Sequence, residues 1–461
     1  MQNFLQNLAL ENIYVDGGQL IFHYSADTHA FWTELYYEGV DFNTLKERYS
    51  PSIIDNLIFH IGFIEGFKYF SLFPRVYNVL RYSKFVNKDL IDLSYLIYNN
   101  VFAQHKWEHS RPDYSGPKIV FDTSAYKDET TEIQIGDIAM LFSCGGGKDS
   151  LVSMKLLERA NIPYAVSQYS HSIYGRHEKQ HQLIDHLVKD CHPVEQNRMY
   201  ILDDFLDGPA LRHHFAGKIK TLCAPETPCS IFEALPLMLT RGYNYLCIGH
   251  ERDAETGSFF WEEINQEVNH QWGKSYEAEL ALNSYIQKNL VSNFRFFSIL
   301  KPIYDFLIFQ LLRKDQEYIF HTHSCNIEKP WCKRCPKCIY VWLLCEAYLD
   351  KQRLWEENLF DLPEAEDTLL QLVGLQEYRP FECVGEIDDA RLAVYFCMKK
   401  GCTGKIINIF KQELVDRVDF SAILQKYNAV YTTGHLIPDI FANRIWPQFY
   451  AAQVAGDGLF R

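Results

Sequence analysis

The chain has 461 residues, of which 47% are hydrophobic and 23% charged, and its formal net charge is −14. This composition is typical of a folded protein and excludes a largely disordered chain. The length exceeds what one hydrophobic core supports, so we expect two or three domains. The negative charge argues against non-specific nucleic-acid binding, which needs an electropositive surface.

The start of the chain has neither a basic stretch nor a long apolar core, so it does not match a signal peptide. Apolar runs such as residues 306–312 are too short to cross a bilayer. The 13 cysteines are an odd number, which favours a reducing compartment over a disulfide framework. We therefore expect a cytoplasmic protein that does not span a membrane.

The first 125 residues are predicted to form an α+β domain. Strand-like runs cover residues 12–26 and 31–39, with a turn at Asp16-Gly17-Gly18. Helical patterns follow over residues 52–98. A polar stretch then leads to a domain boundary near residue 125.

From residue 126 to about residue 320, apolar strands alternate with helical patterns, which indicates a doubly wound α/β domain. The expected strands cover residues 138–142, 164–168, 199–202 and 245–249. Ligands in such folds bind at the carboxyl ends of the strands. This rule nominates the loops after the first, second and fourth strands, which read GGGKDS, QYSHS and GHERDAE.

The loop GGGKDS places three consecutive glycines between a strand and a helix. Backbone N–H groups at such a junction point outward, and the helix dipole behind them favours an anion. The glycine spacing matches neither the Walker P-loop nor the dinucleotide fingerprint. A turn without a ligand is the alternative, but three glycines there would cost backbone entropy without packing anything.

Four cysteines cluster in the sequence HSCNIEKPWCKRCPKC with the spacing C-x6-C-x2-C-x2-C: Cys325, Cys332, Cys335 and Cys338. Four converging thiolates fill a tetrahedral metal site and leave no open position, which predicts a structural Zn²⁺ knuckle over residues 321–345. An iron–sulfur cluster is the alternative interpretation, because C-x2-C-x2-C also occurs in ferredoxins. His321 and His323 lie close enough to replace one cysteine, or they line a pocket. Residues 346–461 are expected to be mainly helical.

The loop GGGKDS resembles the SGGxDS loop of the PP-loop ATP pyrophosphatases, with Gly145 where that family usually has Ser. These enzymes cleave ATP to AMP and pyrophosphate while they activate a substrate oxygen as an adenylate. The resemblance implies that Asp149 holds Mg²⁺ on the pyrophosphate, with Lys148 and Ser150 near phosphate oxygens. The full set of residues expected at the nucleotide is Gly145, Gly146, Gly147, Lys148, Asp149, Ser150 and Asp253.

Four further segments, residues 61–74, 248–279, 296–306 and 379–393, extend the resemblance. Together with the loop and the knuckle, their order is similar to the ATP-dependent UDP-N-acetylmuramoyl-L-alanyl-L-glutamate epimerases of bacterial cell-wall synthesis. The resemblance implies adenylation of the α-carboxylate of a peptide's C-terminal L-glutamate and its inversion to D-glutamate. The implied partners are ATP and a UDP-muramoyl dipeptide or another glutamyl peptide, with no nucleic acid and no membrane.

Inversion needs a base on one face of the α-carbon and a proton donor on the other. The residues expected to touch the reacting groups are His250, Glu251, His270, Lys274 and Cys383. Glu251 and Asp253 could instead be loop caps or salt-bridge partners, and Cys383 could be a core residue.

A metal knuckle after a PP-loop domain also resembles 7-cyano-7-deazaguanine synthase, so an enzyme of nucleobase or tRNA modification is the alternative. That family does not account for the N-terminal region or for the residues after the knuckle. A nucleotide-binding sensor without turnover is a third hypothesis.

Overall fold

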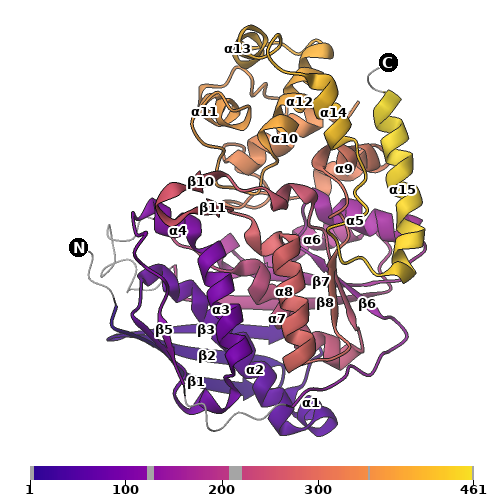
Figure 1. Cartoon of the computed structure of the whole chain (residues 1–461). Coiled ribbons are helices and arrows are strands. Elements are labelled where there is room, and N and C mark those ends of the chain that lie inside the picture. Colours follow the sequence, from indigo (N-terminus) through magenta and orange to yellow (C-terminus); the bar gives the residue numbers. More distant parts are fainter. Residues whose placement is uncertain (1–4, 122–128, 207–220, 351–353, 459–461) are drawn as a thin grey trace.

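The computed structural model describes residues 5–121, 129–206, 221–350 and 354–458. Its centre is a ten-stranded sheet with the order β12-β9-β6-β7-β8-β3-β2-β1-β4-β5. Helices cover both faces of this sheet, and the C-terminal helices gather at one end of the molecule (Figure 1).

One half of the sheet is built by the N-terminal region. Its strands are β1 (Asn7–Asp16), β2 (Gln19–Ala26), β3 (His29–Tyr37), β4 (Val76–Asn78) and β5 (Lys118–Val120). The first three strands are antiparallel, and Asp16 pairs with Gln19 across the predicted turn. The short strands β4 and β5 extend the sheet by parallel pairing beside β1. The expected mixture of strands and helices in this region is confirmed.

The other half is entirely parallel and has the order β8-β7-β6-β9-β12. Its strands are β6 (Met140–Cys144), β7 (Ala165–His171), β8 (Glu195–Asp203), β9 (Tyr245–Ile248) and β12 (Arg295–Ser298). Numbered along the chain, this is the doubly wound order 3-2-1-4-5, with a switch point between β6 and β9. The four predicted strands are all present, and β12 is an additional one.

The two halves meet where β3 pairs with β8 in an antiparallel register, from Thr33 opposite Asp203 to Tyr37 opposite Met199. The predicted boundary near residue 125 therefore divides the sequence but does not divide the sheet. A separate two-stranded hairpin consists of β10 (Phe259–Trp261) and β11 (Gln266–Val268).

The helices between the strands supply both covering layers. In chain order they are α1 (Phe42–Tyr49), α2 (Pro51–Glu65), α3 (Lys88–Val101), α4 (Ala103–Glu108), α5 (Lys148–Arg159), α6 (His177–Val188), α7 (Glu226–Arg241) and α8 (Tyr276–Asn289). Local sequence explains their starts, as in α2, where the Ser50 hydroxyl accepts a bond from the Ile53 N–H and Pro51 occupies the first turn. Helices α2, α3, α7 and α8 share one core with the N-terminal strands.

The C-terminal region packs on the opposite face with α5 and α6. Its helices are α9 (Asp305–Leu312), α10 (Pro336–Tyr348), α11 (Pro363–Leu372), α12 (Ile387–Lys399), α13 (Lys405–Glu413), α14 (Phe420–Tyr427) and α15 (Asp439–Gly458). The expectation of a mainly helical region beyond residue 345 is confirmed. In the described part of the chain, no helix combines the length and the apolar character that crossing a bilayer requires.

Candidate active site

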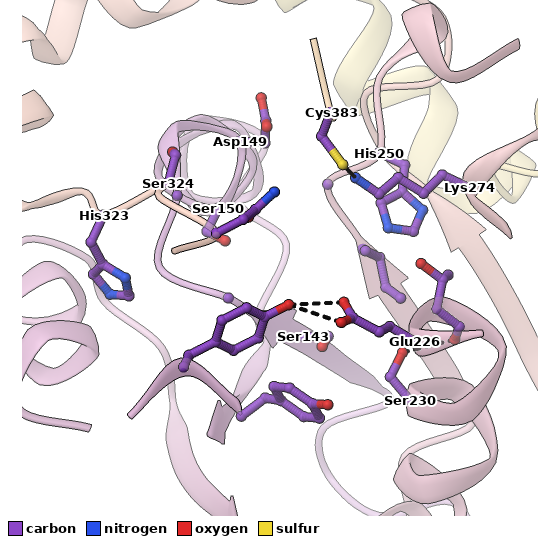
Figure 2. A pocket seen from close by; sticks show the side chains of 18 of the residues that line it. Ser143, Asp149, Ser150, Glu226, Ser230, His250, Lys274, His323, Ser324 and Cys383 are labelled. Atoms are coloured by element: carbon purple, nitrogen blue, oxygen red, sulfur yellow. Dashed lines mark hydrogen bonds between the residues drawn. The ribbon is translucent and has the colours of Figure 1, made fainter. Parts of the chain in front are cut away.

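A cavity of about 270 Å³ lies at the carboxyl ends of β6 and β9, the switch point of the doubly wound sheet. The glycine loop after β6, the loop after β9, the start of α7 and the segment that contains the cysteine cluster all line it (Figure 2). Fold and cavity therefore agree on where a ligand binds. The predicted residues that line this cavity are Gly145, Gly147, Asp149, Ser150, His250, Glu251, Lys274 and Cys383.

The glycine loop is shaped by the segment that precedes the first cysteine. Gly146 has a φ of +81°, and a Cβ there would overlap the ring of His323. The His323 N–H also donates to the Gly146 carbonyl at 2.9 Å. At Gly147 a Cβ would come within 2.9 Å of the Ser324 Oγ, whereas at Gly145 it would meet open space. Gly146 is thus required by its backbone conformation and by a tertiary contact, a side chain at Gly147 would have to displace the Ser324 hydroxyl, and Gly145 leaves room for a ligand.

Lys148 does not reach the cavity. Its Nζ lies 2.5 Å from Asp149 Oδ1 and also pairs with Asp305, and its side chain is fully buried. Burial alone would lower the pKa of Lys148, but the two carboxylates raise it well above its ordinary value. The ammonium therefore stays charged, and it is enclosed by carboxylates. Asp149 keeps 22% of its side chain exposed, on the cavity side.

Asp253 also lies outside the cavity lining, in a buried cluster with Asp305 and Asp389. Its carboxylate accepts bonds from the backbone N–H groups of Glu386, at 3.1 Å, and Asp305, at 3.3 Å. Burial and the neighbouring Asp305 raise the pKa of Asp253 to about 8. A protonated Asp253 and the ammonium of Lys148 together limit the charge of this cluster, so it supports the loop from behind.

Lys274 and Cys383 are in direct contact in the cavity, with their Nζ and Sγ atoms 2.9 Å apart (Figure 2). Burial alone would raise the pKa of the Cys383 thiol, but the ammonium of Lys274, a hydrogen bond with His270 and the charge of Lys337 together outweigh burial and lower the pKa to about 6. At neutral pH the sulfur is therefore a thiolate beside an ammonium, the form in which a cysteine exchanges protons or attacks.

His250 and Glu251 follow β9 and differ in charge. Burial would raise the pKa of Glu251, but Lys148 and Lys274 lower it to about 2, so its carboxylate is ionised. Burial, followed by the charge of Lys274, lowers the pKa of His250 well below its ordinary value. A neutral imidazole and a carboxylate thus lie beside the thiolate in the same cavity.

A second cavity, of about 580 Å³, adjoins the first and contains His270 in its wall. His270 Nδ1 lies 2.6 Å from Gln104 Oε1 on helix α4. The residues that line both cavities are Tyr174, Glu226, Thr227, Lys274, Asn326 and Cys383. The Cys383 thiolate and the Lys274 ammonium therefore lie where the two cavities meet.

Several residues that line the first cavity carry no sequence motif. The Tyr174 hydroxyl donates to Glu226, with distances of 3.0 and 2.9 Å to the two carboxylate oxygens. Tyr174 lies just beyond the QYSHS loop, so the strand-end rule pointed near it. Glu226 begins α7 in an unremarkable sequence, and Lys329 and Lys337 stand within a cysteine cluster whose spacing indicates only a metal.

The four cysteines of the knuckle converge as predicted, with all four sulfur atoms within 4.8 Å of one another. Cys325 and Cys335 have sulfurs 3.8 Å apart, and Cys332 and Cys338 have sulfurs 3.9 Å apart. Four sulfurs at about 2.3 Å from one zinc ion would form a tetrahedron with edges of about 3.8 Å. The donor set therefore fits a single Zn²⁺, whereas an iron–sulfur cluster needs thiolates spread over several irons.

A family model described as the MurL N-terminal domain matches residues 5–182 and 229–299, and one described as the MurL C-terminal domain matches residues 316–425. The chain belongs to the MurL family. The predicted resemblance to the muramoyl-dipeptide epimerase family is thereby confirmed.

Three relatives carry the name UDP-N-acetyl-alpha-D-muramoyl-L-alanyl-L-glutamate epimerase. One from Xanthomonas oryzae pv. oryzae is 30% identical over 267 residues, which is 55% of each chain. Relatives from Micromonospora sp. and Salinispora tropica are each 26% identical, over 57% and 55% of this chain and 58% and 54% of their own. The chain thus spans about half the length of the curated relatives it matches.

Both MurL domains contribute to the cavity. The region matched by the N-terminal model supplies the glycine loop, His250 and Lys274, and the region matched by the C-terminal model supplies His323, Cys383 and the knuckle. In this member of the MurL family, the site therefore lies between the two matched regions.

Proposed function

We propose that this protein is an ATP-dependent epimerase that acts on the C-terminal L-glutamate of a peptide, UDP-N-acetylmuramoyl-L-alanyl-L-glutamate being the substrate suggested by the names of its relatives. One observation carries the proposal: a single cavity has a glycine loop at a helix N-terminus in one wall and the Cys383–Lys274 pair in another. Carboxylate activation and α-proton transfer can then share one site.

The loop fits the phosphates of ATP. Helix α5 begins at Lys148 with Gly147 at its N-cap, and the side chain in contact with a backbone N–H of its first turn is Ser324, whose Oγ accepts from the Lys148 N–H at 3.4 Å. A neutral hydroxyl at 3.4 Å leaves the positive end of the helix dipole uncompensated, which favours an anion. Gly145 and Ser150 line the cavity beside it, and the partly exposed carboxylate of Asp149 is the group placed to hold Mg²⁺. ATP would supply the adenylyl group that converts the substrate carboxylate into a mixed anhydride and releases pyrophosphate.

Adenylation matters because an ionised carboxylate resists removal of the adjacent α-proton. Once the carboxylate is neutralised, the electrons of the broken C–H bond delocalise into the acyl carbonyl. The Cys383 sulfur is the proton-transfer group on one side, and Lys274 keeps it ionised between turnovers. Glu226, held by the Tyr174 hydroxyl, lies across the same cavity and is the candidate for the opposite face (Figure 2).

The second cavity suits the remainder of the substrate. Because both chambers share Cys383, Lys274 and Glu226, the reacting glutamate belongs at their junction, with the nucleotide on the side of the glycine loop. The second chamber is lined by three glutamates, Glu108, Glu226 and Glu382, and by no arginine among the residues described. This lining favours the amide and sugar portions of a muramoyl peptide over a diphosphate.

The test is incubation with ATP and a panel of peptides that end in L-glutamate, the UDP-muramoyl dipeptide among them, followed by chiral analysis of the glutamate. We expect AMP, pyrophosphate and D-glutamate to appear together. Asp149→Ala should abolish AMP formation, and circular dichroism must show that the variant is folded, because the change also removes one of the two carboxylates that enclose the buried Lys148 ammonium. Near-normal turnover in that variant, or AMP formation only with a carboxylated deazapurine, would contradict the proposal.

A further inference from the structure

The positive charges in the first cavity do not come from the glycine loop. Of the described residues that line it, the cationic ones are Lys274, Lys329 and Lys337. Lys148, the loop's own lysine, is enclosed by Asp149 and Asp305 and has no exposed side-chain surface. A polyanionic triphosphate in this cavity therefore needs its cations from elsewhere.

Two of the three cavity lysines have their charge available. Lys274 is committed to the Cys383 sulfur at 2.9 Å. Lys329 Nζ donates to the His323 carbonyl at 3.2 Å, and Lys337 Nζ donates to the Cys383 carbonyl. Neither Lys329 nor Lys337 forms an ion pair with a carboxylate of the described chain. A carbonyl oxygen orients an ammonium without neutralising it. Lys329 Nζ also lies 5.1 Å from the centre of the Tyr174 ring, and the charge of Lys337 helps to lower the pKa values of Glu251 and Cys383. Because neither ammonium is held in an ion pair, each can still contact an anion in the cavity.

Both lysines belong to the metal knuckle. Lys329 stands between Cys325 and Cys332, and Lys337 stands between Cys335 and Cys338. The residues just before Cys325 contact the glycine loop directly, through the His323 N–H to Gly146 O bond and through the Lys148 N–H, which donates to Ser324 Oγ at 3.4 Å. The segment that folds around the metal is thus fixed against the loop and carries its lysines into the same cavity.

We propose that Lys329 and Lys337 bind the triphosphate of ATP, so that the metal knuckle is part of the nucleotide site. This inference rests on the proposed function, because it takes ATP to be the nucleotide. In this proposal the knuckle lysines balance the negative charge of the triphosphate, because Lys148 of the loop is enclosed by Asp149 and Asp305. It also gives the metal a functional consequence, because its four ligands fix the backbone on both sides of each lysine.

The experiment measures binding, by titration calorimetry with Mg²⁺ present, of α,β-methylene-ATP, whose α–β linkage the proposed reaction cannot cleave, and of AMP, which lacks the β- and γ-phosphates. Lys329→Met and Lys337→Met should each weaken binding of the triphosphate analogue by about tenfold or more while AMP binding changes little. The matched control is Lys333→Met in the same knuckle, because Lys333 is 47% exposed and pairs with Glu357 at 2.9 Å outside the cavity. Lys333→Met should bind the analogue as the native protein does.

Lys329→Arg and Lys337→Arg separate charge from packing, and metal content is measured for every variant. We expect the arginine variants to bind the analogue far more tightly than the methionine variants. Native affinity in both methionine variants, or equal losses in arginine and methionine variants at full metal content, would overturn the inference. If the native protein itself neither binds the analogue nor forms AMP, the proposed function fails and this assignment falls with it, a result distinct from the two above.

Discussion

Cys383 and Lys274 show how one contact changes what a side chain can do. A buried cysteine normally has a raised pKa and is inert, because burial disfavours the thiolate. Here the ammonium of Lys274, 2.9 Å away, acts together with His270 and Lys337 to reverse that effect, and the pKa of Cys383 falls to about 6. The pair combines a negative sulfur with a nearby proton source at the junction of two cavities, where the proposed reaction places the α-carbon.

The first prediction follows from this pKa. Alkylation of Cys383 by iodoacetamide, followed peptide by peptide with mass spectrometry, should rise with pH through a midpoint near 6 and then level off. Lys274→Met should raise the midpoint by about one pH unit or more, because the stabilising ammonium is lost, and Lys274→Arg should raise it less. A midpoint at about 8.5 in the native protein, the value of an ordinary thiol, would contradict the prediction.

Glu226 leads to a second prediction, about the other face of the α-carbon. Burial and the neighbouring Glu226 raise the pKa of Tyr174 well above its ordinary value, so the phenol stays protonated and keeps donating to the carboxylate. If Cys383 and Glu226 act on opposite faces, Cys383→Ser and Glu226→Gln should each stop inversion. Each should still exchange the α-hydrogen of one enantiomer with D₂O, and the two variants should exchange opposite enantiomers.

Tyr174→Phe is the matched control for this experiment, since it removes the hydrogen bond and keeps the carboxylate. We expect Tyr174→Phe to slow inversion while the α-hydrogens of both enantiomers still exchange with D₂O. Inversion by Glu226→Gln at more than about half the native rate would remove Glu226 from the mechanism.

Sequence alone pointed to the glycine loop and the four cysteines, and it gave Lys274 and Cys383 as separate candidates in two segments. It did not indicate that these two side chains contact each other. It did not reveal that Lys148 is enclosed, because its partner Asp305 is 157 residues away along the chain. The bond between Tyr174 and Glu226 likewise joins positions 52 residues apart. Contacts of this range depend on how the strands are ordered in the sheet, which no local pattern states.

At the scale of elements, the glycine loop and the knuckle form one unit. Gly146 adopts a left-handed conformation, and the His323 ring occupies the space that a side chain would need. Gly145, the residue before it in the loop, has neither constraint. The run of three glycines therefore serves two purposes, a close approach to the knuckle and an open face toward the cavity.

The third prediction compares these two glycines. Gly146→Ala should lower the free energy of unfolding in urea by about 1 to 2 kcal/mol from backbone strain, and further from the overlap with His323. Gly145→Ala should change it by about 0.5 kcal/mol or less, because a methyl group fits there. Equal stabilities of the two variants would show that the knuckle does not constrain the loop.

The fourth prediction concerns the metal. The protein should contain about one zinc ion per chain, because the sulfur spacing fits one tetrahedral ion. Chelation should lower the melting temperature, since binding energy at such a site is also folding energy. Acid-labile sulfide with visible absorbance would indicate an iron–sulfur cluster instead.

Most strands could be predicted from local sequence, but the order in which they pair in the sheet could not. Runs such as residues 138–142 are apolar enough to identify as strands, whereas β12 has only four residues, Arg295–Ser298. The antiparallel pairing of β3 with β8 joins two regions that the sequence separates by a polar stretch. No residue pattern near position 125 indicates that the sheet continues across it.

Across the whole molecule, the cavity collects contributions from both matched MurL domains and from both sides of the switch point between β6 and β9. The glycine loop contributes the N-terminus of helix α5, the knuckle contributes lysines, and the region beyond it contributes Cys383. This convergence is what a two-step reaction needs, because an activated carboxylate has to be inverted before it meets water.

The most direct test of the proposed function follows the α-hydrogen in D₂O. With ATP, Mg²⁺ and the UDP-muramoyl dipeptide, deuterium should enter the glutamate α-carbon of the D-product, as measured by mass spectrometry after chiral separation. Without ATP, or with the terminal α-carboxylate replaced by an amide, no deuterium should enter, because no activated carboxylate can form. Inversion at full rate without ATP would contradict the account.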